Sequence, residues 1–373
     1  MKNKIILLIS PESWGRNFVS KHHYANYLAK NNTVYFLNPP TTFTKNPFGD
    51  VKCKSSVITN NLTVVNYINL LPKLNNLPKA IQKSTYKKQA KQIQNAIGVA
   101  EFDLVWSFDP NRFFDQTIWQ AKTTIYHTVD FHPNSKYEKE IILSSDLFLG
   151  VTNRILEEHT SYRKGIEITH AADLDGFEYT ENITLPGANK IRAIYTGNFH
   201  KHINYQLLDD LAKENPAVDF IMIGPTADSN LSSKNTIEIR LLEKLKAKNN
   251  IHFIGSIPST QLMSYINKCA INLVLFKKEN ELIHCSPHKL MGYFYSGNVT
   301  LSNFIEAHKN TSTEIITMCR TAEETLHQFE EIKSNLSEWN SAELTSKRKE
   351  FAIANSYLSK INTIENLLKK LND

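Results

Sequence analysis

The fold of this chain is indicated most clearly by one stretch, Ile191-Arg192-Ala193-Ile194-Tyr195-Thr196-Gly197-Asn198. A short apolar strand ends there in glycine, and the next segment has helical character. The same alternation of strand and helix runs along most of the sequence, which predicts right-handed crossovers and parallel sheets with helices on both faces. The expected strands are Lys4–Ile9, Thr33–Leu37, Leu62–Asn66, Asp103–Ser107, Thr124–Val129, Leu147–Val151, Ile166–Thr169, Ile191–Thr196, Phe220–Ile223, Ile251–Ile254, Ile271–Leu275, Val299–Ser302 and, more briefly, Ile315–Met318. The expected helices include Val19–Lys30, Lys79–Ile97, Tyr205–Glu214, Glu238–Lys248, Ser259–Asn267 and Lys289–Ser296.

The alternation is interrupted once, by a polar stretch from Asp173 to Asn189 that contains Pro186 and Gly187. Such a stretch is typical of a linker. The sequence therefore predicts an α/β protein of two Rossmann-like, doubly wound lobes, at residues 1–175 and 190–340, facing each other across a cleft. Residues 341–373 form an amphipathic helical tail that we expect to pack back toward the first lobe. In sheets of this kind ligands bind beyond the carboxyl ends of the strands.

Composition excludes several classes of protein. Of the 373 residues, 41% are hydrophobic and 21% are charged, so the chain is not disordered, collagen-like or a coiled coil. Its apolar runs are too short for a membrane span or a secretion signal. The four cysteines lack metal-binding spacing and are interpreted as reduced thiols. These features predict a cytoplasmic protein.

Positive charge is concentrated in one segment. Between Asp50 and Glu101 the sequence has no acidic residue and eight lysines, namely Lys52, Lys54, Lys73, Lys79, Lys83, Lys87, Lys88 and Lys91. Leucines lie among the lysines between residues 70 and 77. The Lys73–Lys91 region could therefore bind to an anionic membrane surface from the cytoplasmic side. The alternative is that the leucines pack inward and the lysines only solvate one side of a helix.

Three strand-end loops have the character of an anion site. Gly197 and Asn198 are followed by Lys201, and Gly224 ends the strand Phe220–Ile223. In the third loop, Ser286-Pro287-His288-Lys289 opens a helix, and a lysine in a first helical turn is unfavourable unless something negative lies beside it. For Gly197 alone, an ordinary tight turn is the competing interpretation.

The segment from Ser286 to Gly297 resembles the "P-x-K-x-x-E-Y-x-A-x-G" donor motif of GT-B glycosyltransferases. Five other segments are similar to further parts of that family, in the family's order: Ala171–Phe177, Tyr195–Asn198, Phe220–Pro225, Asn250–Gly255 and Asn355–Ile361. The resemblance implies a GT-B fold and transfer of a sugar from a nucleotide sugar to a saccharide or lipid-linked acceptor, in the synthesis of a surface polysaccharide. It assigns donor binding to Gly197, Asn198, Lys201, Gly224, Ser286, Pro287, His288, Lys289, Gly292 and Tyr293.

One departure from the family pattern concerns two carboxylates. The retaining family-4 enzymes have two glutamates with seven residues between them, and the second one binds the ribose. The corresponding positions here are His284 and Gly292. The chain is also similar to bacterial exopolysaccharide and teichuronic-acid-type transferases, including inverting glucuronosyltransferases, with which Trp14 and Arg16 agree.

An inverting transferase needs a general base that accepts the proton of the attacking hydroxyl. Asp130 follows the strand Thr124–Val129, and Asp109 follows Asp103–Ser107, so both are candidates. Either could instead form a turn or cap a helix, and His127 is interpreted as strand packing. No pair of aspartates has the position needed for a metal-bridged diphosphate, since Asp209 and Asp210 fall on a predicted solvent-facing helix. We therefore expect no cofactor and no obligatory metal.

Three alternatives remain open at this point. A sugar-nucleotide 2-epimerase shares the two-lobe architecture but would leave the lysine segment without a role. A catalytically degenerate nucleotide-sugar-binding paralogue would explain His284 and Gly292. A nucleic-acid-binding protein is disfavoured, because only Tyr67 and Tyr86 interrupt the basic segment and single-strand binders interleave aromatic residues with basic ones.

Overall fold

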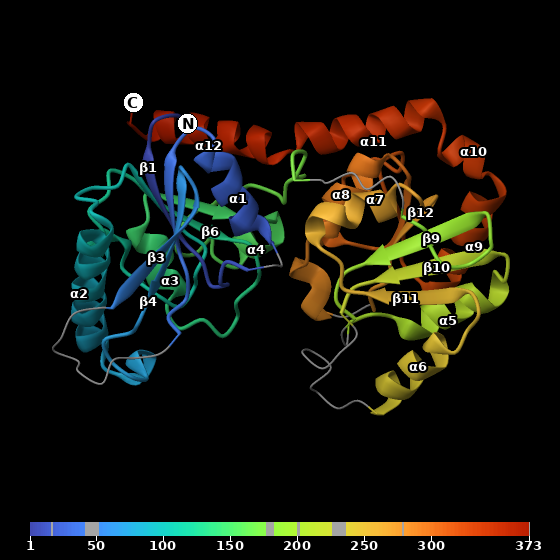
Figure 1. The fold of residues 1–373 in the computed structure, drawn as a ribbon, viewed down its shortest axis with the longest axis horizontal. Coiled ribbons are helices and arrows are strands. Elements are labelled where there is room, and N and C mark those ends of the chain that lie inside the picture. Colours follow the sequence, from blue (N-terminus) through green and yellow to red (C-terminus); the bar gives the residue numbers. More distant parts are fainter. Residues whose placement is uncertain are drawn as a thin grey trace. The chain divides into compact units, whose positions relative to one another are not determined.

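The structure is a computed structural model that describes residues 1–15, 18–41, 52–176, 183–199, 202–225, 236–277 and 280–372. The chain divides into two compact units (Figure 1). The first consists of Met1–His170 together with Tyr357–Asp373, and the second of Ala171–Ser356. Residues 341–356 of the expected helical tail thus belong to the second unit, and residues 357–372 to the first.

In the described part of the first unit, eight strands form one sheet in the order β3-β4-β2-β1-β5-β6-β7-β8. All neighbouring pairs are parallel except β3 with β4, which are antiparallel. The strands are β1 (Ile5–Ile9), β2 (Thr33–Leu37), β3 (Cys53–Thr59), β4 (Leu62–Tyr67), β5 (Leu104–Ser107), β6 (Thr124–Thr128), β7 (Leu147–Gly150) and β8 (Ile166–Glu167).

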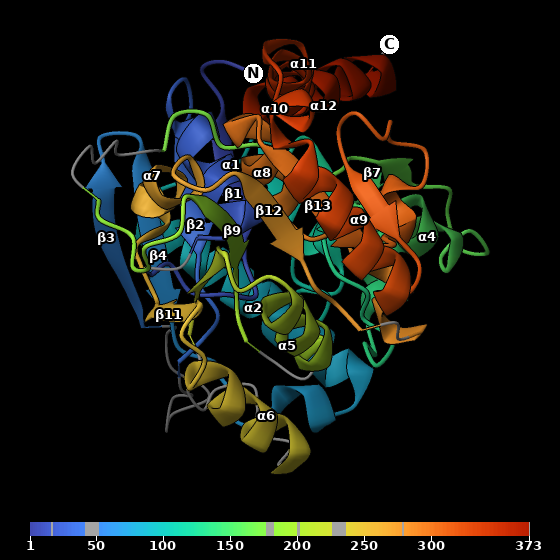
Figure 2. The same cartoon turned by 90° about the vertical axis from the view of Figure 1, so that its right-hand side faces the viewer.

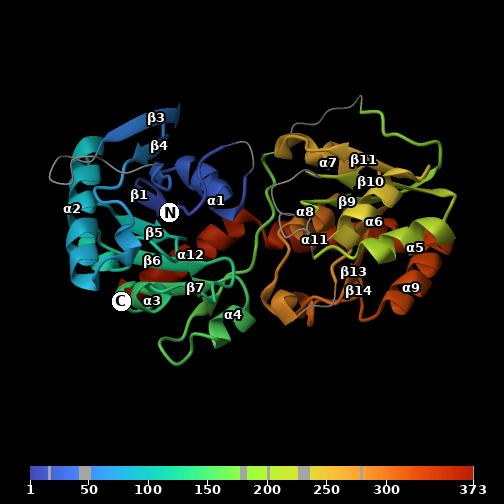
Figure 3. The ribbon, with the colours of Figure 1, turned by 90° about the horizontal axis from the view of Figure 1, so that it is seen from below.

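Helices cover both faces of this sheet. On one face, α1 packs beside α12, where the rings of Tyr24 and Tyr27 meet Tyr357 and Tyr24 also contacts Trp106 of β5. On the other face, Tyr86 and Ile93 of α2 are buried, and α2 also contacts β3 (Figure 3). The helices are α1 (Ser20–Ala29), α2 (Lys79–Ile97), α3 (Glu138–Ser144), α4 (Asn153–Glu157) and α12 (Tyr357–Asn372), with short 3-10 turns η1 (Leu74–Asn76) and η2 (Gln116–Ile118).

The sheet of the second unit is parallel throughout its described strands, in the order β11-β10-β9-β12-β13-β14. Its strands are β9 (Ile191–Thr196), β10 (Val218–Ile223), β11 (Ile251–Gly255), β12 (Ile271–Val274), β13 (Val299–Asn303) and β14 (Thr317–Cys319). Every residue of β10 and β12 is buried, as expected for strands covered on both faces.

The helices of the second unit also lie on both faces of its sheet. On one face α5 contacts both α6 and α9, and on the other α11 packs against α8 (Figure 2). Buried Arg348 of α11 donates hydrogen bonds to the carbonyl oxygens of Gly297, Glu314 and Trp339. The elements are α5 (Tyr205–Glu214), α6 (Thr236–Lys246), α7 (Leu262–Ile266), α8 (Lys289–Ser296), α9 (Ala322–Ser334), α10 (Leu336–Trp339) and α11 (Ala342–Ala354), with 3-10 turns η3 (Ser259–Gln261), η4 (Asn280–His284) and η5 (Glu306–His308).

The predicted doubly wound α/β architecture is confirmed, with two exceptions in detail. The edge strand β3 was not predicted, since its mostly exposed residues show no apolar run. The expected solvent-facing position of Asp209 was wrong: this side chain is buried and pairs with Lys244 (2.6 Å) and Lys248 (2.9 Å), linking α5 to α6 and the segment after it. In the parts of the chain that the structure describes, no helix is both long and apolar enough to cross a membrane.

Candidate functional site

Two glycines shape the carboxyl ends of β9 and β10 in the second unit. Gly197 has φ +131° and Gly224 has φ +146°, conformations that other residues rarely adopt. The loops meet backbone to backbone, because Gly197 N–H donates to Ile223 O (2.9 Å) and Gly224 N–H donates to Gly255 O (2.9 Å). A Cβ atom on Gly224 would lie 2.0 Å from Gly197 O. Both positions therefore require glycine, and the N–H groups of both glycines are already used in holding the loops together.

Lys289, the first residue of α8, reaches toward these loops. Its Nζ lies 3.7 Å from the centre of the Tyr195 ring and 5.3 Å from that of Phe276. A Cβ on Gly197 would be 2.8 Å from the same Nζ. Desolvation lowers the pKa of Lys289 to about 7, while the nearby Cys285 thiol acts weakly in the opposite direction. The Lys289 amine thus lies against two aromatic rings and has no ion pair among the described residues. A bound anion could therefore pair with it.

The residues before α8 form a tight turn. Leu290 N–H donates to Pro287 O (3.1 Å) and Met291 N–H to His288 O (3.3 Å), and Pro287 is buried while Ser286 and His288 are partly exposed. The first turn of α8 contains no acidic residue. The positive end of the helix dipole and the Lys289 amine therefore act together, which favours a bound phosphate.

Two other predicted donor residues have roles that the sequence did not indicate. Tyr293 is fully buried, and its hydroxyl accepts hydrogen bonds from Thr196 N–H (2.8 Å) and Thr196 Oγ1 (3.1 Å). Any contribution of Tyr293 to a ligand is therefore indirect, through the end of β9. At Gly292 an added Cβ would meet only Met263 Sδ, 3.8 Å away, so the position has room for a methyl group.

Among the remaining donor candidates, Asn198 is exposed at the end of β9, and its carbonyl accepts a long hydrogen bond from Tyr195 (3.4 Å). Lys201 lies outside the described residues, as does Arg16. Trp14 is described, and its ring packs against His22 and Phe36 at the carboxyl end of β2.

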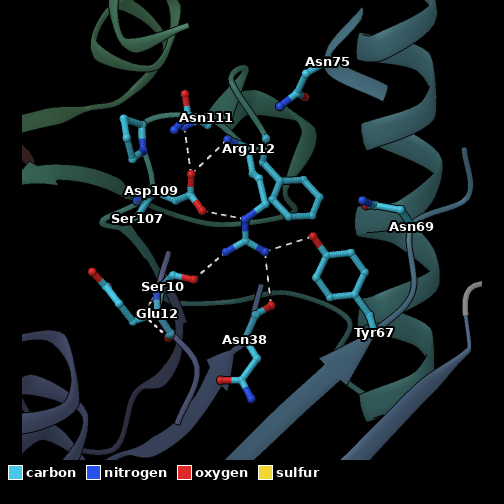
Figure 4. Close-up of polar contacts among 12 residues, drawn as sticks. Ser10, Glu12, Asn38, Tyr67, Asn69, Asn75, Ser107, Asp109, Asn111 and Arg112 are labelled. Carbon is cyan, nitrogen blue, oxygen red and sulfur yellow. Dashed lines mark hydrogen bonds and ion pairs between the residues drawn. The ribbon is translucent and has the colours of Figure 1, made fainter. Parts of the chain in front are cut away.

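In the first unit, Asp109 belongs to a buried polar network (Figure 4). One carboxylate oxygen accepts from the N–H groups of Asn111 (2.8 Å) and Arg112 (3.1 Å), and the other pairs with Arg112 Nε (2.5 Å). The Arg112 guanidinium also donates to Ser10 O (2.5 Å), Asn38 O (3.1 Å) and the Tyr67 hydroxyl (2.9 Å). This network ties together the loops after β1, β2 and β5 and the end of β4. Asp109 is only 3% exposed, so its oxygens are already used for structure.

Asp130 has a different environment. It follows β6, its side chain is exposed, and its backbone carbonyl accepts from Thr128 Oγ1 (2.7 Å). Desolvation raises the pKa of Asp130 above its usual value, against the lowering effects of Lys21 and His132; Glu12 adds to the rise. A carboxylate with a raised pKa and access to solvent is better suited to accept a proton than the paired Asp109.

Lys21 and Glu12 were missed in the sequence. Lys21, the second residue of α1, is almost completely buried, and its amine pairs with Glu12 (2.5 Å) in the loop after β1. Lys21 is unusual only because it is buried, and no pattern in the neighbouring sequence predicts this burial. His127, by contrast, stacks on Trp106 and contacts the tilted ring of Phe108 in the core, and burial lowers its pKa to about 3, which agrees with a packing role. The described residues contain no cluster of three or more metal-ligating side chains.

Comparison with known proteins gives fold neighbours but no sequence family. No family model matches the chain, and no curated protein matches it. Sucrose-phosphate synthase from Thermosynechococcus elongatus aligns over 99% of this chain and 99% of its own, with 14% identity and a TM-score of 0.69. A glycosyltransferase from Rickettsia africae aligns over 100% of both chains, with 13% identity and a TM-score of 0.67. A third neighbour, described as trehalose-6-phosphate from E. coli bound with UDP-2-fluoro glucose, aligns over 97% of this chain and 98% of its own (11% identity, TM-score 0.66).

The chain has the GT-B fold. Its two candidate regions lie at the carboxyl ends of parallel strands, one in each unit, where ligands bind to sheets of this type. The candidate region in the second unit brings together Gly197, Gly224 and Lys289. The region in the first unit has an exposed carboxylate, Asp130, beside the Glu12–Lys21 pair.

Proposed function

We propose that this protein transfers a glycosyl group from a nucleoside diphosphate sugar to a saccharide or lipid-linked acceptor. The observation that carries the proposal is the Lys289 amine at the start of α8, which faces the glycine loop after β9 and has no ion-pair partner among the described residues. A diphosphate supplies the negative charge that this arrangement lacks. One fold neighbour is a sucrose-phosphate synthase and another is described as bound with UDP-2-fluoro glucose, which supports the same class of donor. Surface polysaccharide synthesis and a hexosyl or glycuronosyl donor remain part of this proposal.

The direct test is a thermal-shift and calorimetry panel of UDP, GDP, dTDP and their sugar conjugates, with inorganic phosphate as the control. A ligand that binds the folded state raises the melting temperature by mass action. Lys289→Ala should weaken binding of the responding nucleoside diphosphate by roughly ten- to a hundredfold, since a charge-assisted hydrogen bond contributes about 1.5–3 kcal/mol. If no nucleotide stabilises the protein, the proposal fails.

In the proposed reaction, the acceptor oxygen forms a bond to the anomeric carbon as the bond from that carbon to the diphosphate breaks. Asp130 accepts the proton of the attacking hydroxyl, and Lys289 with the amino end of α8 stabilises the departing diphosphate. We prefer Asp130 to Asp109 as the base because Arg112 already occupies the Asp109 carboxylate. Since the diphosphate charge is met by these groups, we propose that the reaction is metal-independent.

A second candidate function is nucleotide-sugar binding without turnover. It is favoured by Gly292, which stands where family-4 enzymes have their ribose-binding glutamate and where an added Cβ meets only Met263. In that case the nucleotide panel would give the same thermal shifts, but no nucleoside diphosphate would be released from a donor sugar in the presence of acceptors.

The acceptor side of the proposal includes the membrane surface. Lys73, Lys79, Lys83, Lys87, Lys88 and Lys91 are all exposed, whereas Leu70 and Leu74 are buried. Lys79 pairs with Glu140 and Lys83 with Asp115 (2.6 Å), which reduces the free charge of this face. We therefore propose a peripheral, purely electrostatic attraction to anionic lipid on the cytoplasmic side, without insertion of the leucines.

A further inference from the structure

The sheet of the second unit has a point at which the chain reverses the direction in which it adds strands. From β9 the chain proceeds to β10 and β11 on one side, and it then returns to β12, β13 and β14 on the other. In open parallel sheets, ligands bind in the crevice beyond the carboxyl ends of the two strands at such a switch point. In this unit those two strands are β9 and β12.

The two strands separate before β9 ends. The ladder between them stops with Ile194 opposite Asn272. On its other side β9 stays paired with β10 as far as Thr196, and there Gly197 N–H donates to Ile223 O (2.9 Å). Because successive N–H groups of a strand point to opposite sides, the Thr196 N–H points toward β12. It meets a side chain there instead of a strand.

That side chain is Tyr293 of α8. Its hydroxyl is fully buried and accepts hydrogen bonds from Thr196 N–H (2.8 Å) and Thr196 Oγ1 (3.1 Å). A buried N–H group without a partner is costly. The Tyr293 hydroxyl therefore completes the end of β9 where β12 no longer does so.

Tyr293 and Lys289 lie one turn apart on the same face of α8, since side chains four residues apart on a helix are neighbours. Both reach the end of β9. The Tyr293 hydroxyl meets Thr196, and Lys289 Nζ lies 3.7 Å from the centre of the Tyr195 ring. The same amine is 5.3 Å from the centre of the Phe276 ring, which follows β12. Lys289 therefore lies at the switch point, and Tyr293 ties its helix to β9 there.

A second buried hydroxyl of α8, that of Ser296, serves a different part of the unit. Ser296 Oγ donates to Tyr293 O (2.6 Å) and accepts from Asn298 N–H (3.2 Å) and Asn272 Nδ2 (3.2 Å). These three contacts fix the carboxyl end of α8, about two turns from Lys289. They do not involve the end of β9.

We propose that Tyr293 is a positioning residue whose hydroxyl keeps the Lys289 amine aligned with the loop after β9, where the diphosphate binds. The inference rests on the proposed function, and it gives Tyr293 a part in binding without contact with the ligand. Residues in one hydrogen-bond network change each other's contribution to an equilibrium constant by roughly two- to a hundredfold. Loss of the hydroxyl should therefore be measurable as weaker binding of the diphosphate.

The test is a double-mutant cycle on diphosphate affinity, measured by calorimetry with UDP, GDP and dTDP. Tyr293→Phe removes the hydroxyl alone and should weaken binding of the responding diphosphate by at least about threefold. In the Lys289→Ala background the same change should have no further effect, because the amine through which it acts is gone. A role confined to stability would not depend on Lys289 in this way.

Ser296→Ala is the matched control, because it also removes one buried hydroxyl from α8. Both variants should lower the melting temperature, but Ser296→Ala should leave the affinity for the diphosphate unchanged. If Tyr293→Phe does not fold, Thr196→Val replaces it in the cycle. This variant removes the contact from Thr196 Oγ1 and keeps the contact from Thr196 N–H.

The outcomes separate the two proposals. Wild-type affinity in the variant used, an equal loss in Ser296→Ala, or a loss that persists in the Lys289→Ala background would overturn the positioning role alone. Failure of every nucleoside diphosphate to bind the wild-type protein would overturn the proposed function, and the positioning role with it.

Discussion

The amine of Lys289 lies 3.7 Å from the centre of the Tyr195 ring, so a cation is held over an aromatic face at the end of a central strand. The ring attracts the positive charge, yet desolvation dominates and lowers the pKa of the amine to about 7. Near neutral pH the site is thus close to the midpoint of its own titration.

Binding of a diphosphate should therefore take up protons. At pH 8 the Lys289 amine is mostly neutral, and an adjacent phosphate raises its pKa and restores the charge. Calorimetry in two buffers of different ionisation enthalpy should show uptake of part of a proton in the wild type. Lys289→Met should show a smaller uptake or none. Equal proton uptake in both proteins would exclude Lys289 from the phosphate contact.

The same shift has a consequence for the free protein. The ordinary pKa of 10.5 applies to the unfolded chain, so between pH 7 and 10.5 the unfolded state binds more protons than the folded state. Stability from this group therefore rises with pH across that window. Chemical denaturation at several pH values should show a flatter profile for Lys289→Met.

Neutralising the two candidate bases should have opposite structural effects. Asp109→Asn removes the charge that compensates buried Arg112, and breaking such a pair costs about 3–5 kcal/mol. Asp130→Asn removes an exposed carboxylate whose ionised form is disfavoured in the folded protein, so the unfolding free energy should be unchanged or slightly higher. Urea denaturation of both variants measures the contrast. A stable Asp109→Asn protein would show that the network in Figure 4 is not essential to the fold.

Asp130→Asn, which should leave stability nearly unchanged, should strongly reduce catalytic turnover. Asp130→Asn should bind the donor normally while losing activity by about 10²–10⁴-fold, the usual contribution of general acid–base catalysis. The measurement is release of nucleoside diphosphate from the donor found in the nucleotide panel. Near-normal turnover of Asp130→Asn would show that the reaction proceeds without this base.

Two glycine substitutions should change stability in opposite directions. In Gly224→Ala, the new Cβ would lie 2.0 Å from Gly197 O at a positive φ, so stability should fall by more than about 1 kcal/mol. Gly292→Ala places a methyl group within α8 at an ordinary contact distance of 3.8 Å from Met263 Sδ, and the gain in helix propensity should add about 0.5–1 kcal/mol. Thermal unfolding compares the two; a destabilised Gly292→Ala protein would mean that this face of α8 has less room than described.

The lysine face of α2 can be tested without disturbing its ion pairs. Lys87→Glu/Lys91→Glu avoids Lys79 and Lys83, which pair with Glu140 and Asp115. Wild-type protein should sediment with phosphatidylserine vesicles at low salt and not with phosphatidylcholine vesicles, and the variant should bind less. Lys213→Glu/Lys268→Glu, with the same change of charge on exposed lysines of the second unit, is the control. If the wild-type protein does not sediment with anionic vesicles, a soluble acceptor is favoured.

The strands and their order of succession were predictable because parallel strands covered on both faces are continuous apolar runs, as in β10 and β12. The edge strand β3 was not, since an exposed strand lacks that pattern. Glycines at 197 and 224 were visible as strand-end signals. The different environments of Asp109 and Asp130 could not be predicted from the sequence. They depend on hydrogen bonds from Arg112 to Ser10, Asn38 and Tyr67, which are distant in sequence.

The first unit is assembled from both ends of the chain, and this sets an order for its folding during synthesis. The second unit is continuous from Ala171 to Ser356, so it can close as soon as that stretch has left the ribosome. The first unit is made earlier but must wait for α12, whose Tyr357 packs against Tyr24 and Tyr27. Until Tyr357 has been synthesised, these rings of α1 lack their partner, so a nascent chain arrested before Tyr357 presents an apolar surface to chaperones.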